Sequence, residues 1–329
     1  YIVYCILYIV YCIMYNLSLM IKVITIIRDE VEIEETYVKS SVVEKDGFKY
    51  GIIYLPKFYI DFDDQNSRDA GKDVAKEVDR LKAAGVQGIV MNVRDNGGGS
   101  LKTVVDIAGL FIEQGPIVQI KSAAGKKEVL YDRDSKVQWD GPLVVMVNEF
   151  SASASEIFAA AIQDYKRGLI VGSTSSYGKG TVQRNVAFGK PLDAMGIQTE
   201  YGAVKLTFQK FYRVTGSSTQ RKGVVPDVVF PDDYEFLKYR EKDNPSALPW
   251  DEMERAKFSP WTSSNEIATI AAKANNKIKN DTATIRFKKN LQWVSAQVDK
   301  SVALEINKYR QYKKEIQNVI FGPFFRLKR

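Results

Sequence analysis

A serine-rich turn and a lysine between two glycines are the residues of this chain best suited to chemistry. The serines occupy "SASAS", residues 151–155, between an apolar run and a predicted helix. Lys179 follows a second apolar run in "GLIVGSTSSYGKGTVQ", residues 168–183. A serine at a helix start lies at the positive end of the helix dipole, beside N–H groups that have no partner within the helix. The turn is therefore a suitable position for an acyl-transfer nucleophile.

The chain contains no histidine, so a serine nucleophile here needs a different base. Burial lowers the pKa of a lysine because it disfavours the charged ammonium, and a neutral lysine can accept the proton of a serine. Lys179 suits this role because Gly178 and Gly180 permit close approach of the backbone. Gln183 falls on the same face as Lys179 if the segment is extended. The alternatives are a helix-capping serine and a solvated loop lysine.

The loop "RDNGGGS", residues 94–100, is a third candidate. An isolated triple glycine is most often a flexible turn between a strand and a helix. A phosphate-binding loop is not indicated, because neither the P-loop spacing nor GxGxxG is present. Glycines also expose backbone N–H groups, which can stabilise a developing oxyanion.

Alternating strands and helices predict an α/β fold around these loops. Asn66 or Ser67 is expected to cap a first helix through Leu81, with Val74, Val78 and Leu81 on its buried face. Ligands bind beyond the carboxyl ends of strands in such folds, so residues 94–100 and 148–156 are the expected site. Strands are predicted within residues 21–35, 48–60, 85–93, 115–122, 126–132, 141–149 and 168–172, and further helices over 102–111, near 157–165 and after 264.

Charge and cysteine content exclude several classes of protein. The net charge is +7, but basic and acidic residues are interleaved, so nucleic-acid binding is not indicated. The two cysteines, Cys5 and Cys12, both lie near the N-terminus, so a disulfide framework is not predicted. The absence of histidine also removes the commonest zinc ligand, and no metal or organic cofactor is expected.

Residues 1–21 carry no charge and repeat "IVYCI" at 2–6 and 9–13. Their length suits a membrane span, but their tyrosines are spread throughout instead of gathering at the two interfaces. A signal peptide is not indicated, because the basic start and the cleavage site are missing. Two interpretations stay open: a membrane or export segment, and a low-complexity artefact of a truncated reading frame.

From about residue 22 to 250 the sequence resembles the C-terminal processing, or tail-specific, serine proteases, particularly the larger periplasmic type. The motifs occur in the family's order: "RDNGGG", "GLFIEQGPIVQ", "SASASEIFAAAIQDY", "VGSTSSYGKGTVQ", "QKFYRVTGSSTQRKGVVPDVV" and "NPSALPWD". The resemblance implies an α/β fold with a ClpP/crotonase-like βαβ catalytic core. It implies protein or peptide substrates with apolar C-termini, with an adaptor protein or a second copy as further partners. It also implies a location in the bacterial periplasm or cell envelope, where association with the inner membrane is open.

The resemblance further implies a Ser/Lys dyad, with Ser153 as nucleophile and Lys179 as base. Gln183 matches the family glutamine that positions the lysine. The oxyanion donors would be the N–H of Ala154 and of a loop glycine, for which Gly98 is the best match.

Asp164 matches a family position associated with activity, but it lies far along the helix from the serines, which favours a structural role. The family carries a PDZ domain ahead of the core, and only residues 21–35 resemble its last part. We therefore expect an uncharged segment over 1–21, a PDZ remnant with linker strands over 22–46, a protease core over 47–232 and a C-terminal helical region over 233–329.

Two alternatives belong to other classes of function. One is a non-catalytic peptide- or ligand-binding module on the same core. The other is a membrane-anchored scaffold in which residues 1–20 span the bilayer. Cleavage of an unstructured substrate with an apolar tail separates the protease from both. The C-terminal helices are equally consistent with a surface for a partner or substrate and with a solvated appendage.

Overall fold

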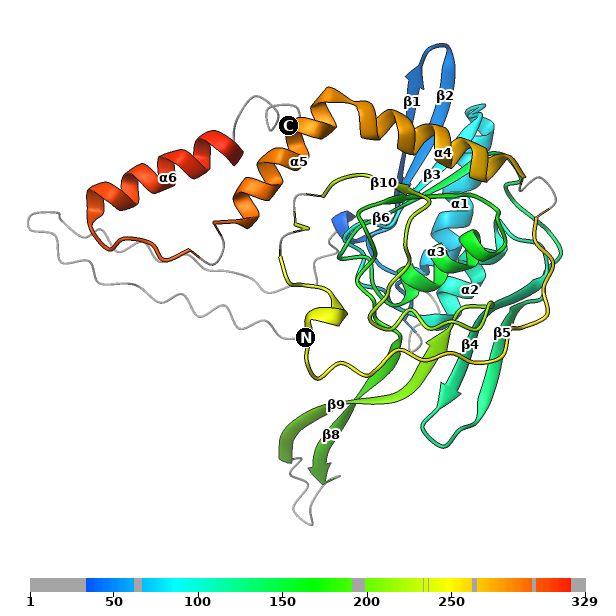
Figure 1. Cartoon of the computed structure of the whole chain (residues 1–329). Helices are drawn as coiled ribbons and strands as arrows, with labels where there is room; N and C mark the ends of the chain where they lie inside the picture. The colour runs from blue at the N-terminus through cyan, green and yellow to red at the C-terminus, as the bar shows by residue number, and fades with distance from the viewer. Residues whose placement is uncertain are drawn as a thin grey trace, which may run out of the picture. The chain divides into compact units, whose positions relative to one another are not determined.

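A six-stranded sheet forms the centre of the fold (Figure 1). The computed structural model describes residues 34–61, 67–190, 199–232, 234–235, 237–261, 265–297 and 300–320. The first two strands of the sheet pair antiparallel, and every later pair in it is parallel, as the predicted α/β fold requires. The strands lie in the order β1 (Lys39–Lys45), β2 (Phe48–Tyr54), β3 (Gly88–Asn92), β6 (Leu143–Val147), β7 (Leu169–Gly172) and β10 (Val228–Val229).

Three helices connect the parallel strands: α1 (Ala70–Ala83), α2 (Leu101–Gly109) and α3 (Ala154–Asp164). Successive crossovers from β2 to β3, β6 and β7 move in one direction, and the right-handedness of such connections puts their helices on one face. Accordingly α1 contacts α2, and α2 contacts α3. The apolar side chains that these helices bury include Val74, Val104 and Phe158.

The predicted start of α1 was wrong by a few residues. Asp69 is the cap, because its side chain accepts the N–H of Gly71 at 2.7 Å. Ser67 lies before the helix, and residue 66 lies outside the described residues. The predicted buried face of Val74, Val78 and Leu81 is confirmed.

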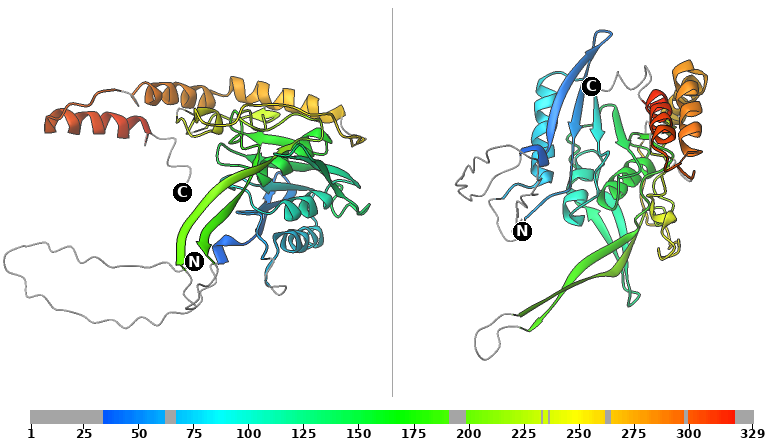
Figure 2. Two further views of the ribbon diagram at one scale, coloured as in Figure 1. Left: turned by 90° about the horizontal axis from the view of Figure 1, so that it is seen from below. Right: turned by 90° about the vertical axis from the view of Figure 1, so that its left-hand side faces the viewer.

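A second, antiparallel sheet has the order β5 (Lys127–Asp132), β4 (Gly115–Ser122), β9 (Thr199–Tyr212) and β8 (Thr181–Lys190). The strands predicted over 115–122 and 126–132 are confirmed, and they pair antiparallel as a hairpin. The β8–β9 pair extends well beyond β4 and β5 as a long ribbon (Figures 1 and 2), which the sequence did not predict. Its side chains are mostly exposed, so it lacks the alternation of apolar and polar residues that marks a half-buried strand. The ribbon begins two residues after Lys179.

The end of the chain is helical, as predicted, with η2 (Glu241–Asp243), α4 (Asn265–Asn280), α5 (Thr282–Ser295) and α6 (Ile306–Ile320). Helix α4 is joined to the central sheet through Asn275, whose side chain accepts the N–H of Val229 at 3.2 Å and donates to the carbonyl of Asp227 at 2.7 Å. Within the described ranges, none of the helices combines the length and apolar character that a membrane span needs.

Most of the N-terminal predictions lie outside the described residues. This applies to the uncharged segment over 1–21 and to nearly all of the strand and PDZ remnant predicted over 21–35. Residues Glu34–Thr36 form a short 3₁₀ helix, η1, so the predicted strand does not include them.

Pairing of β3 with β6 brings the glycine loop and the serine turn together. Asn92 lies opposite Met146, so the two loops leave the same edge of the sheet. The N–H of Ala152 donates to the carbonyl of Asn96 at 3.0 Å, which joins the loops directly. The glycine loop and the serine turn therefore lie side by side beyond the carboxyl ends of two adjacent parallel strands, where the site was expected.

Candidate active site

Of the three serines in the turn, Ser153 has the hydroxyl that is available for chemistry. Ser151 and Ser155 are buried, and their Oγ atoms donate to the carbonyls of Val93 at 2.8 Å and Asn96 at 2.7 Å. Ser153 is partly exposed, and its Oγ has no hydrogen-bond partner in the part of the chain that the structure describes. Its backbone is strained, with φ 57° and ψ −114°, a conformation that costs a non-glycine residue about 1–3 kcal/mol.

The glycine loop packs directly against the nucleophile candidate. Gly98 has φ 107°, and a Cβ placed on it would lie 2.8 Å from Ser153 Cβ and 3.1 Å from the nitrogen of Ala154. Only glycine fits this contact. The N–H of Gly98 donates to Asn96 Oδ1 at 2.8 Å, whereas the N–H of Ala154 has no partner among the described residues. Of the two predicted oxyanion donors, Ala154 therefore has the free N–H in this conformation.

Glu156 connects the serine turn to the lysine turn. Its Oε2 accepts the N–H groups of Ser153 and Lys179, each at 2.9 Å. Its Oε1 accepts the hydroxyl of Ser176 at 2.5 Å and the N–H of Gly178 at 2.7 Å. Burial raises the pKa of Glu156 to about 7. The four donors favour the ionised carboxylate and oppose this rise.

The sequence analysis missed both Glu156 and Asn96. A signal for Glu156 was present, because Ser153 and Glu156 have the S-x-x-E spacing of a capping box. Asn96 had no comparable signal. Its side chain is fully buried and bonds Gly98 on one side and the carbonyl of Leu55 on the other, at 2.8 Å each.

Glu156→Gln should destabilise the protein by about 2–4 kcal/mol, because whichever oxygen becomes an NH₂ leaves two buried donors unpaired. We expect a lower denaturation midpoint in urea and lower activity, since both turns lose a common anchor. Ser176→Ala is the comparison: it removes one of the four donors and leaves the N–H of Val224 without its acceptor, but it keeps the bonds of the carboxylate to both turns, so activity should fall less. Equal stability of Glu156→Gln and the parent protein would contradict this account of the carboxylate.

Lys179 lies half-buried in the turn between β7 and β8. Burial lowers its pKa, and the positive charge of Lys205 lowers it further, while Glu241 and Glu156 oppose both effects. The direction of this shift is the one that a lysine base needs. Among the described residues no hydrogen bond joins Lys179 Nζ to Ser153 Oγ. Catalytic hydrogen bonds often tighten only when substrate is bound.

Gln183 lies at the start of the exposed ribbon. Its Nε2 donates to Thr207 Oγ1 at 3.1 Å on the facing strand, and the ladder is irregular between Val182 and Gln183. The structure thus pairs Gln183 with β9, and its role in positioning Lys179 stays a prediction.

Asp164 is the last residue of α3, about 16 Å from Ser153 by the rise of a helix. Both of its carboxylate oxygens bind the guanidinium of Arg213, and its side chain is only 5% exposed. These contacts hold the end of α3 against the loop that follows β9, which fits the structural role favoured by the sequence.

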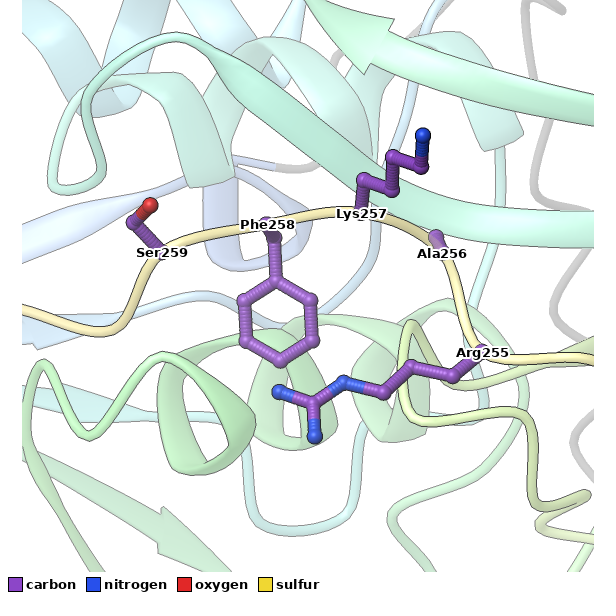
Figure 3. A pocket seen from close by; sticks show the side chains of 5 residues that line it. All are labelled: Arg255, Ala256, Lys257, Phe258 and Ser259. Carbon is purple, nitrogen blue, oxygen red and sulfur yellow. The ribbon is translucent and has the colours of Figure 1, made fainter.

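An open surface pocket of about 510 Å³ lies elsewhere, along Arg255–Ser259 (Figure 3). Phe258 in this segment packs on Tyr165, just past the end of α3, with ring centroids 4.9 Å apart. The guanidinium of Arg255 lies over the ring of Phe258. None of the predicted site residues lines this pocket.

Comparison with known proteins identifies two regions. "Peptidase family S41" matches residues 49–230, and "C-terminal domain of tail specific protease" matches residues 234–320. The tail-specific protease of Haemophilus influenzae is 41% identical over 239 residues, which are 72% of this chain and 32% of that protein. The carboxy-terminal-processing protease of Bartonella bacilliformis is 32% identical over 209 residues, 63% of this chain and 43% of that protein.

Among solved structures, the photosystem II D1 C-terminal processing protease is 27% identical with a TM-score of 0.47, covering 59% of this chain and 48% of that one. The chain thus spans less than half the length of these relatives. The match to the S41 family covers more than half of the chain and includes the glycine loop, the serine turn and Lys179. From this match we conclude that the chain belongs to peptidase family S41.

Proposed function

We propose that this chain is a serine endopeptidase that cleaves proteins at or near apolar C-terminal tails, through an acyl-enzyme on Ser153. The observation that carries the proposal is the difference between the three serines of the turn. Ser151 and Ser155 use their hydroxyls to hold the turn, which leaves that of Ser153 for chemistry. Membership of a peptidase family supports the reaction class.

In the proposed mechanism, neutral Lys179 takes the proton of Ser153 as Oγ attacks the scissile carbonyl carbon. The N–H of Ala154 and a glycine-loop N–H stabilise the oxyanion of the tetrahedral intermediate. The C–N bond then breaks, and Lys179 gives its proton to the leaving amine. Water, deprotonated by Lys179, next attacks the ester carbonyl, and Lys179 returns the proton to Ser153 Oγ as the ester bond breaks. Every step uses side chains and backbone of this chain, so the scheme needs no metal or organic cofactor.

Substrate class, partners and location are part of the same proposal. The names of the relatives support protein substrates processed at their carboxyl ends. The apolar tail, an adaptor protein or second copy as partner, and a place in the periplasm or cell envelope rest on the resemblance described above.

The test of the proposal uses two matched peptides with an apolar tail, one a free acid and one an amide. We expect residues 22–329 on their own to cleave an unstructured substrate slowly and to distinguish little between the two peptides, because in this family a PDZ domain captures the free carboxylate. Binding energy from a remote contact positions the scissile bond, so losing that contact removes selection before chemistry.

The measurement is the ratio of kcat/KM for the two peptides, with and without a complete PDZ domain fused ahead of residue 22. Fusion should raise the ratio in favour of the free acid. A strong preference for the free acid in residues 22–329 alone would contradict the assignment of tail recognition to that domain. Absence of cleavage in both proteins would favour a binding module instead.

A further inference from the structure

The short helix η2 lies beside the lysine turn, although it belongs to the C-terminal domain and not to the S41 region. The N–H of Glu241 donates to the carbonyl of Tyr177 at 3.0 Å. The carboxylate of Glu241 accepts Gln220 Nε2 at 2.9 Å, and Gln220 Oε1 in turn accepts the N–H of Gly180 at 2.8 Å. These contacts hold the backbone on both sides of Lys179.

The connection is buried and reaches the serine turn. Gln220 is fully buried, so it cannot exchange its contact with Glu241 for water at low cost. On the other side, the N–H of Tyr177 donates to the carbonyl of Ser151 at 3.0 Å. A displacement of Glu241 would therefore be transmitted to both turns of the site.

Three charged groups act on Lys179, each from a different element: Lys205 on β9, Glu241 on η2 and Glu156 on α3. Burial and Lys205 lower the pKa of Lys179, and Glu241 and Glu156 raise it. Burial and the charge of Glu241 also raise the pKa of Tyr177, which places the carboxylate close to this side chain as well. Glu241 is thus an electrostatic as well as a hydrogen-bonding neighbour of the lysine turn.

We propose that Glu241 is a positioning residue of the active site, by which the C-terminal domain holds the lysine turn in place and sets a negative charge beside Lys179. The inference rests on the proposed role of Lys179 as the base. It assigns to the C-terminal domain a part in catalysis in addition to any contact with partners. A core that lacks residues 234–320 would keep Ser153 and Lys179 but lose this control.

The test compares kcat/KM as a function of pH for three variants of the full chain. Glu241→Gln keeps an oxygen for Gln220 but removes the charge, so the ammonium of Lys179 is less favoured and the rise in activity should begin at lower pH. Lys205→Gln removes a positive charge and should move the rise to higher pH. Asp243→Asn is the matched control: its carboxylate accepts the N–H of Arg240 instead, and the profile should not move. Glu241→Ala should in addition lower kcat by about tenfold.

A second readout is independent of activity. In Ser153→Ala protein, the titration of Lys179 followed by NMR should shift down with Glu241→Gln and up with Lys205→Gln. Unchanged titration in both variants would overturn the inference while leaving the dyad intact. If Lys179→Arg were fully active, the proposed function would fall, and the NMR titration would still decide whether Glu241 acts on the lysine.

Discussion

Ser153→Ala is expected to abolish peptide cleavage, by at least about a thousandfold in kcat/KM, while the protein stays folded. The hydroxyl forms the covalent bond to the substrate, so no neighbouring group can replace it. The fold should tolerate the change because Ser153 Oγ holds no structural hydrogen bond among the described residues. Cleavage of a fluorogenic peptide and a urea melt measure the two effects separately.

Ser151→Ala and Ser155→Ala are the matched controls, because each also removes one hydroxyl from the same turn. Each removes a hydroxyl donor from a backbone carbonyl that keeps one N–H donor, and Ser151→Ala also leaves the N–H of Asn148 without its acceptor. We expect a loss of about 1 kcal/mol in stability and at least partial activity. An inactive Ser155→Ala together with an active Ser153→Ala would show that the nucleophile has been assigned to the wrong serine.

Lys179→Arg should reduce kcat by about 10²–10⁴-fold, because a guanidinium stays protonated and cannot take the proton of Ser153. In the parent protein the base acts only when neutral. The neutral fraction of Lys179 grows as the pH rises through its pKa, so kcat/KM should rise with pH and then level off. Since burial lowers that pKa, the plateau should be reached below the pH at which an exposed lysine would lose its proton.

The control for this change is Lys205→Arg, which keeps a positive charge near the site on an exposed strand and should keep the parent profile. Normal turnover by Lys179→Arg, or a pH profile without a rise, would eliminate the lysine as base.

The sequence predicted the fold where strongly apolar runs alternate with helices. Strands β3, β6 and β7 are short and apolar, and the loops that follow them carry the motifs, so both the α/β class and the place of the site could be inferred. The β8–β9 ribbon could not, because most of its side chains are exposed on both faces and its pattern is not that of a half-buried strand.

The supporting contacts of the site were also beyond the sequence analysis. Asn96, Glu156 and Glu241 act through hydrogen bonds to backbone groups that are distant in the chain, and local periodicity does not encode such pairings. Gln183 shows the converse. Spacing along an extended segment puts it on the face of Lys179, and that role stays a prediction; its contact with Thr207 on the facing strand is what the spacing could not show.

The most direct test of the central claim is to trap the acyl-enzyme. The protein is mixed with an activated ester of an apolar peptide, quenched in acid within the first turnover, digested and mapped by mass spectrometry. The account predicts one added acyl group on the peptide that contains residues 151–155, localised to Ser153 by fragmentation and absent from Ser153→Ala protein. An acyl group on Ser151, Ser155 or a residue outside the turn, or turnover without any covalent adduct, would contradict it.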